Sequence, residues 1–448
     1  MPSTRTARPP APQPPPDTGP ATSPPSLASR DLTRRGFLRS VGVVGAGLAL
    51  GACARGSGGS GTTEIVFFQS KPEVIGYFDE LIQQFHDAQS KVRVRHDATS
   101  NLAGSFVRER PPDIGCLNYN FEISRYVERG VLSDLGDMPE AARIRPDLQP
   151  LIDVTATYPD RTSVIPYSLM AAAVLYNRTI FAEHDLTPPT TWDELIGVCD
   201  TLTAAGVTPI YGTFKDPWTI AQGHFDYAVG GRLDTTKFFN QLKRQGTNVG
   251  PDSPVSFEKQ FLDPVEQMQQ LLPYSNPNAA SRGYGDGNLA FASGEAAMYL
   301  QGPWAIGEIA KTNPDLDVGA FPLPMTDDPA DRKVRVNIDL ALWIPEGSRK
   351  KAAAREFLTF LMQPDVIDAY NAHALGFGVT TDAAPVTNPT LVELQEYYDR
   401  ADFYIGASQL VPQSIPLQNY TQSLAAGDAP KPVLSTLDAD WRRLAFRS

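Results

Sequence analysis

Short apolar runs and amphipathic stretches alternate along the chain from residue 64 onwards. Glu64–Phe68 (EIVFF) has the pattern of a buried strand, and Glu73–Ala88 carries apolar residues at the i, i+3, i+4, i+7 spacing of a helix. Lys91–His96 alternates as a strand with one polar side. Asp113–Leu117 is a third short strand, followed by a helix over Phe121–Glu128. Strands alternating with helices predict βαβ units, hence an α/β fold with a mostly parallel sheet.

Two further apolar runs predict strands, and the second of them is followed by a predicted strand-to-helix corner. Ser168–Tyr176 and Ala296–Leu300 are both strand-like. Gly302 allows a sharp turn after the second of them, and Pro303 suits the first position of a helix. Trp304 is therefore placed at a strand-to-helix corner, where an indole can stack on a flat, hydroxylated ligand. The alternative is a Trp packed in the core beneath the turn.

Polar residues follow the first and third predicted strands. Gln69, Ser70 and Lys71 come after the first strand, and Asn118, Tyr119 and Asn120 come after the third. Ligands of open α/β sheets bind beyond the carboxyl ends of the strands, and amide side chains can both donate to and accept from hydroxyl groups. Turn formation is the alternative role for these residues.

Composition narrows the class of protein. The chain has 448 residues, enough for two domains, and a net charge of −12, which argues against a nucleic-acid partner. Its five His residues show no His-Glu-x-x-His or other paired spacing, so we expect no metal and no cofactor. Cys116 and Cys199 lie in apolar patterns, which favours two buried free thiols over a disulfide.

The first 52 residues differ from the rest. Pro, Ser, Thr and Ala dominate residues 2–29, and the pair Arg34 and Arg35 precedes the apolar stretch Val41–Ala52, which is too short to span a bilayer. This order resembles a twin-arginine export signal. Residues 1–52 are therefore expected to be a signal peptide.

The apolar stretch ends in Leu-Gly-Ala-Cys, which resembles the lipobox of bacterial lipoproteins. The resemblance implies that Cys53 is acylated after cleavage, with residues 53–63 as a flexible tether rich in Gly and Ser. An ordinary cleavage site beside a Cys is the alternative.

Four further blocks carry a family resemblance. They are Tyr176-Asn177; Pro-Pro-Thr-Thr-Trp-Asp-Glu-Leu with the following Ala-Gly-Val-Thr-Pro; Ser-Gly-Glu-Ala-Ala-Met with Gly-Pro-Trp; and Ala352–Met362 followed by Gln-Pro. Together they resemble the extracellular solute-binding proteins of carbohydrate ABC importers, of the maltose-binding type, over about residues 64–375. The resemblance implies a two-lobed fold with a hinge and an interlobe cleft. Lobe 1 would hold residues 64–168 and 320–375, and lobe 2 would hold residues 169–319 and 376–448.

The resemblance also implies ligand contacts. In the family, the loops after the first and third strands and the Trp of Gly-Pro-Trp contact ligand, which here are residues 69–71, 118–120 and Trp304. Other segments with aromatic, amide or carboxylate side chains add further candidates for ligand contact, namely Asp216, Trp218, Tyr284, Asn337 and Phe377. Residues 281–288 are rich in glycine and predict a loop that carries Tyr284. The family's maltose-binding type has an aromatic and an acidic residue in the third-strand loop where this chain has Asn118–Asn120, so maltose itself is not expected.

The predicted function is the binding component of an importer. A monomer, held by lipid at the extracellular face of the cell membrane, would bind a mono- or oligosaccharide and deliver it to permease subunits. A glycoside-active secreted enzyme is one alternative, since Asp216, Asp286 and Asp339 could supply a pair of carboxylates. A binding protein for another polar solute is the second alternative.

Overall fold

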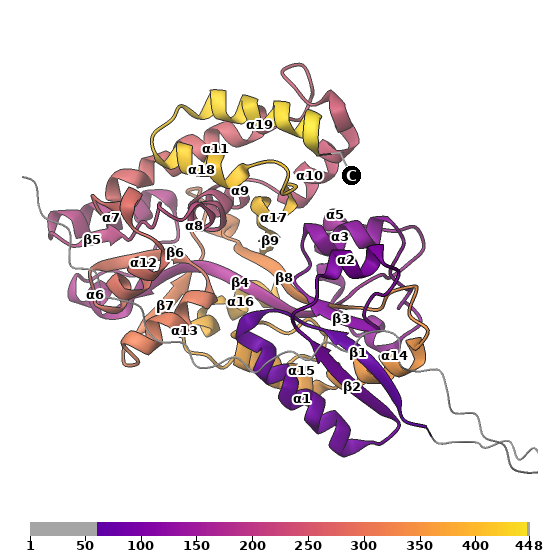
Figure 1. Cartoon of the computed structure of the whole chain (residues 1–448). Coiled ribbons are helices and arrows are strands. Elements are labelled where there is room, and N and C mark those ends of the chain that lie inside the picture. Colours follow the sequence, from indigo (N-terminus) through magenta and orange to yellow (C-terminus); the bar gives the residue numbers. More distant parts are fainter. Residues whose placement is uncertain (1–60, 446–448) are drawn as a thin grey trace, which may run out of the picture. The chain divides into compact units, whose positions relative to one another are not determined.

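Nine strands within the described residues 61–445 form one mixed sheet in the computed structural model (Figure 1). Their order is β2-β1-β3-β8-β4-β6-β5, with β7 beside β4 and β9 beside β8. The strands are Thr63–Phe68 (β1), Val92–Asp97 (β2), Ile114–Leu117 (β3), Ile165–Asn177 (β4), Thr208–Ile210 (β5), Ala296–Gln301 (β6), Val318–Phe321 (β7), Val334–Trp343 (β8) and Phe403–Ile405 (β9). The export signal at residues 1–52, with Arg34 and Arg35, and the lipobox Cys53 lie outside the described residues.

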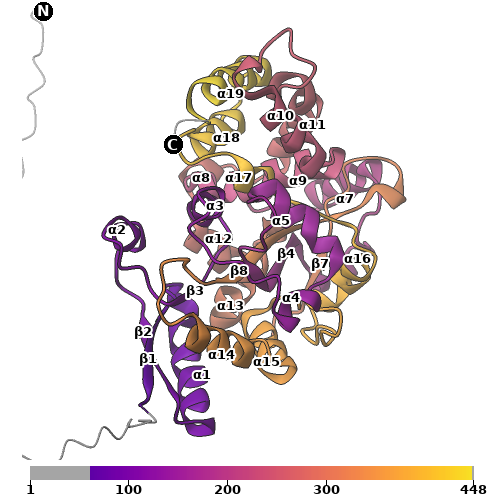
Figure 2. The same cartoon turned by 90° about the vertical axis from the view of Figure 1, so that its right-hand side faces the viewer.

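Helices lie between the strands as the apolar spacing predicted. In the first half of the chain they are Ile75–Ala88 (α1), Leu102–Val107 (α2), Phe121–Glu128 (α3), Pro139–Ala142 (α4), Gln149–Thr155 (α5), Arg178–Glu183 (α6), Trp192–Ala204 (α7), Pro217–Ile220 (α8), a π-helical segment Ala221–Phe225 and Asp226–Arg232 (α9). The later helices are Thr235–Gln245 (α10), Phe257–Leu271 (α11), Tyr284–Ala292 (α12), Pro303–Thr312 (α13), Lys351–Leu361 (α14), Pro364–Ala374 (α15), Gln395–Asp399 (α16), Ala407–Leu410 (α17), Leu417–Ala425 (α18) and Pro430–Leu444 (α19). Helix α19 packs along α11, and α18 packs against α8 (Figures 1 and 2). No helix within residues 61–445 is long and apolar enough to cross a membrane.

The strands β4 and β8 connect the two halves of the sheet. Residues 165–172 of β4 pair antiparallel with β8, whereas residues 173–177 pair with β6 and β7. Strand β8 also pairs antiparallel with β3, so it reaches the part of the sheet that contains β1 and β2. The prediction of a mostly parallel sheet is wrong, because β4 runs antiparallel to all three of its neighbours.

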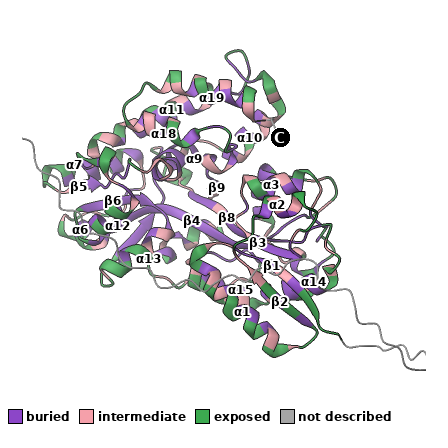
Figure 3. Ribbon diagram, in the orientation of Figure 1, coloured by how far each residue is buried: buried purple, intermediate pink, exposed green. Residues whose placement is uncertain are grey.

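The hydrophobic core is centred on β4. Every residue of β4 is buried, as expected for a strand with helices on both faces (Figure 3). Cys116 on β3 and Cys199 on α7 are both free and fully buried, which confirms the prediction of two buried thiols. Burial raises the pKa of the Cys199 thiol to about 12, so this thiol is inert as a nucleophile.

The corner that presents Trp304 has the predicted form. Gly294 adopts a positive φ of 75° before β6, Gly302 is the N-cap of α13 and Pro303 is its first residue. One prediction in this region is wrong, because residues 284–288 of the predicted loop belong to α12 (Tyr284–Ala292). The start of α12 is fixed by two carboxylates: Asp216 accepts from the Tyr284 backbone N–H at 2.7 Å, and Asp286 accepts from the Gly283 N–H at 2.8 Å.

Candidate ligand-binding site

One pocket collects side chains from both halves of the sheet. It has a volume of about 550 Å³ and is lined by the loop after β1, by Met170 of β4 and by residues of α8, α12, α13 and the end of α15. Four of the residues proposed from sequence line it together: Lys71, Trp218, Tyr284 and Trp304. This volume lies within the range of about 300–1,000 Å³ that is usual for small-molecule sites.

Three aromatic side chains form one side of the pocket. The rings of Trp218 and Tyr284 lie with centroids 5.0 Å apart and planes tilted by 59°. The Tyr284 hydroxyl donates to the backbone carbonyl of Trp304 at 3.2 Å, and the Trp304 Nε1–H donates to Gln301 Oε1 at 3.1 Å. Because its N–H is held by its own corner, the half-buried indole offers its ring rather than its polar edge.

A network of polar groups that begins at Lys71 of the pocket lining joins residues on or after three strands. The Lys71 ammonium donates to both carboxylate oxygens of Asp339, at 2.8 and 2.9 Å. The Asn118 amide donates to the Asp339 carbonyl at 2.6 Å and to its Oδ1 at 3.0 Å. Asp339 is 3% exposed. One buried carboxylate on β8 therefore fixes the polar residues that follow β1 and β3.

Asp339 was not among the predicted ligand contacts, although its neighbour Asn337 was. The sequence signal available was its position two residues after Asn337 on a strand, because alternate residues share a face. Asn337 lies directly opposite Met170 in the sheet, accepts from an Arg335 Nη at 3.1 Å and is half-buried. Asn337 and Asp339 thus share the face on which Met170 lines the pocket.

The rim of the pocket is charged, and its charges are paired. Lys71 also lies 3.5 Å from the Glu73 carboxylate, and Lys311 lies 2.6 Å from Glu308. The His373 imidazole stacks on the ring of Tyr77 with centroids 4.5 Å apart. Each of the two ion pairs has at least one exposed side chain, so each contributes little to stability.

Three of the predicted residues are buried away from the pocket surface. Tyr119 is 5% exposed, and its hydroxyl donates to the carbonyls of Ile152 and Ala156. Phe377 is 1% exposed and packs on the Tyr398 ring at 5.0 Å. Gln69 is fully buried, and its amide has no hydrogen-bond partner among residues 61–445. Tyr119, Phe377 and Gln69 therefore belong to the core and do not line the pocket.

Other predicted residues hold the backbone near the pocket. Asn120 caps α3 by accepting from the N–H groups of Glu122 and Ile123. Asp216 holds the first N–H of α12, as described above. Ser70 is half-buried between Gln69 and Lys71. The sequence did not distinguish residues whose side chains line the pocket from residues that shape the neighbouring loops.

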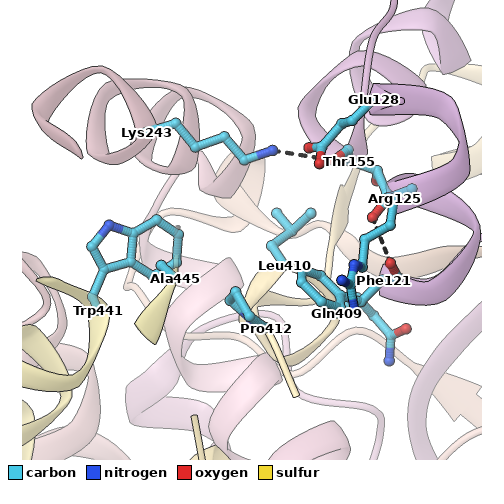
Figure 4. A pocket seen from close by; sticks show the side chains of 11 residues that line it. Phe121, Arg125, Glu128, Thr155, Lys243, Gln409, Leu410, Pro412, Trp441 and Ala445 are labelled. Carbon is cyan, nitrogen blue, oxygen red and sulfur yellow. Dashed lines mark hydrogen bonds between the residues drawn. The ribbon is translucent and has the colours of Figure 1, made fainter. Parts of the chain in front are cut away.

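A second, smaller cavity of about 290 Å³ lies where α3 and α5 meet α10, α17 and α19 (Figure 4). Its lining includes Arg125, Glu128 and Leu410. At its edge the Lys243 ammonium donates to the carbonyls of Val154 and Thr155, at 2.6 and 3.1 Å, which ties α10 to the end of α5. A cation bound to the last carbonyls of a helix is a favourable cap.

Comparison with known proteins identifies the family. Residues 71–367 match the family model described as bacterial extracellular solute-binding protein, which is more than half of the chain. The chain belongs to this family. The family proposed from the four sequence blocks, and the two-lobed α/β fold that it implied, are confirmed.

Individual relatives are distant. The multiple sugar-binding protein of Streptococcus mutans is 21% identical over 342 residues, which cover 74% of this chain and 79% of that protein. An uncharacterized ABC transporter extracellular-binding protein of Pyrococcus horikoshii is 25% identical over 264 residues, 55% of this chain, and the match spans only 57% of that relative's length. Among solved structures, apo RafE of Streptococcus pneumoniae superposes with a TM-score of 0.74 at 20% identity, covering 85% of this chain and 98% of RafE. RafE in complex with raffinose superposes with a TM-score of 0.71 at 21% identity, covering 85% of this chain and 99% of RafE.

Proposed function

We propose that this protein binds a mono- or oligosaccharide in the 550 Å³ pocket as the substrate-binding component of an ABC importer. The observation that carries the proposal is the pairing of an aromatic side, Trp304, Trp218 and Tyr284, with a polar network at Lys71 and Asn118. Sugar rings have apolar C–H faces that stack on aromatic rings and hydroxyl edges that exchange hydrogen bonds with amides and cations.

The comparisons support this class of ligand. The relative from Streptococcus mutans is named a multiple sugar-binding protein, and RafE has been solved with raffinose. At 20–21% identity these similarities establish the fold alone. The proposal for the ligand of this chain therefore depends on the residues of its own pocket.

We also propose that two lobes close on the sugar. Residues 64–168 and 320–375 form one lobe, and residues 169–319 and 376–448 form the other. The strands β4 and β8, which pair in both halves of the sheet, are the segments that must bend. Contacts from Lys71 on one side and Trp304 on the other would differ between open and closed states, which is the requirement for ligand-driven closure.

Export and anchoring complete the proposal. The twin-arginine motif would direct export, acylated Cys53 would hold the protein at the outer face of the membrane, and the closed form would dock on permease subunits. A Cys53→Ser chain should then appear in the medium instead of the membrane fraction. Membrane retention of this variant would contradict the anchor.

The hydrogen bonds of the three candidate carboxylates favour a binding protein over a glycoside hydrolase. Asp216 and Asp286 hold backbone N–H groups at the start of α12, and Asp339 holds Lys71 and Asn118. Glycoside hydrolysis needs one carboxylic acid able to give a proton and a second carboxylate near the scissile bond. Carboxylates committed to these donors are suited to positioning.

A thermal-unfolding panel tests the proposed function. Raffinose, stachyose, maltotriose, xylotriose and the common hexoses are added to the full chain at millimolar concentration. A ligand present at 100 times its Kd stabilises the folded state by about 2.7 kcal/mol, which is visible as a rise in Tm. At least one saccharide should raise Tm without being cleaved. A panel with no response, or with cleaved sugar, would contradict the proposal.

A further inference from the structure

Around the pocket, the two ammonium groups of Lys71 and Lys311 lie beside three carboxylates, and one of these carboxylates is buried. Lys311 is paired with Glu308 at the rim, and Lys71 has two carboxylates beside it, exposed Glu73 and buried Asp339. The Glu73 side chain is 63% exposed, so water and salt screen its effect on Lys71. The Asp339 side chain is 4% exposed and the Lys71 side chain 14%, so this pair is the one that decides the charge at the polar side.

The geometry leaves Lys71 little freedom to act as a cation. Both Asp339 oxygens accept from the same ammonium group, and Asn118 holds the carboxylate from another direction. A ligand carboxylate entering the pocket would meet a lysine that is already neutralised, together with Glu73 and Glu308 at the rim. Taking such an anion out of water without a free cation is unfavourable.

We infer that Asp339 is a specificity-determining residue, which makes the pocket select uncharged saccharides and reject sugars that carry a carboxylate. Asp339 acts through Lys71 and Asn118, which it positions and whose charge it balances. This inference rests on the proposed saccharide-binding function and deepens it by naming the substrate class. Removing the charge of Asp339 while keeping its shape leaves Lys71 free to pair with a ligand carboxylate.

The test is a pair of opposite charge changes in the full chain. Asp339→Asn should bind trigalacturonate, an anionic trisaccharide, at least about ten-fold more tightly than the wild type, since one ion pair buried in the complex becomes available. Its binding should weaken as salt is raised. Lys71→Gln leaves the Asp339 carboxylate without its cation. This variant should therefore gain affinity for the glucosamine trimer, which is cationic at mildly acidic pH. The double variant Asp339→Asn with Lys71→Gln should gain neither.

Matched controls separate specificity from folding. Asp113→Asn removes a buried carboxylate of the β1 region that holds the Val66 N–H and Lys350 but does not line the pocket. It should lower Tm without creating affinity for either charged probe. Asp339→Glu keeps the negative charge, so this variant should reject trigalacturonate as the wild type does. Asp339→Asn is expected to gain affinity for the anionic probe and Lys71→Gln for the cationic probe. If one variant fails to fold, the other still tests the inference.

The outcomes are distinct from those of the proposed function. If wild type binds trigalacturonate as tightly as neutral trisaccharides, or if neither single change alters charge preference, the role of Asp339 is overturned while saccharide binding stands. If wild type binds no neutral saccharide, the proposed function fails, and the two charge-change variants still report whether Asp339 and Lys71 set the charge of this pocket.

Discussion

Trp304 lines the pocket and is held there by its immediate neighbours. Its ring lies against Gly302, where an added Cβ would come within 2.2 Å of a ring carbon, and its N–H is bound to Gln301. By contrast, Trp441 is 1% exposed on α19, which packs along α11. A strand-to-helix corner and an amphipathic helix place their Trp side chains differently.

His224 is the residue whose titration should appear in the stability of the protein. It is 4% exposed beside the Phe214 ring, and burial lowers its pKa from 6.5 to about 4. The native state therefore keeps the imidazole neutral where the unfolded chain takes up a proton. The free energy of unfolding should be fully retained above pH 6.5 and fall by roughly 3 kcal/mol as the pH decreases to about 4. Urea titrations at pH 7.5 and 4.5 measure this loss.

The control is the same pair of titrations on His224→Gln, which cannot gain the proton. This variant should lose less stability over the same pH interval, whatever its stability at pH 7.5. An identical loss in both proteins would show that other groups cause the pH dependence.

At the scale of elements, sequence patterns predicted what depends on local spacing. The helix over Phe121–Glu128 matches to the residue, and β1 to β3 match within one or two residues. The start of α12 was missed although Asp286 caps it locally, and its second carboxylate, Asp216, lies 68 residues earlier in the chain. The antiparallel pairing of β4 was missed because partners of a long crossing strand are set by tertiary packing and not by its own apolar run.

The corner before α13 gives a prediction at this scale. Gly302→Ala should push the indole of Trp304 out of place, because the new methyl would overlap three of its ring atoms at 2.2–2.6 Å. Affinity for the saccharide that stabilises the wild type should fall about ten-fold or more, as expected for a misplaced hot-spot aromatic residue. Calorimetry and near-ultraviolet circular dichroism measure the affinity and the indole environment.

Gly197→Ala on α7 is the matched control. A Cβ at Gly197 meets no atom within 4 Å, so this change should raise stability by about 0.5–1 kcal/mol and leave binding unaltered. Equal binding by the Gly302 and Gly197 variants would mean that the corner does not position Trp304.

At the scale of the whole molecule, the site is made by parts that are distant in sequence. Lys71 and Asp339 are 268 residues apart, and the aromatic side comes from α8, α12 and α13. Four predicted residues lie together in the pocket: Lys71 and Trp304 were predicted from their places after a strand and at a strand-to-helix corner, and Trp218 and Tyr284 from the chemistry of predicted loops. Asp339 and the burial of Tyr119 could not be read in this way, because both depend on which strand becomes the neighbour of β3.

Isothermal titration calorimetry of the wild type and Trp304→Ala, with the saccharide that raises Tm most, tests the central claim most directly. We expect one binding site in the wild type. We expect the variant to lose at least about 2 kcal/mol of binding free energy, roughly 30-fold in Kd, with its unliganded Tm little changed because Trp304 is only half-buried. Equal affinity in the two proteins, or no heat of binding with any saccharide, would contradict the assignment of this pocket as a sugar-binding site.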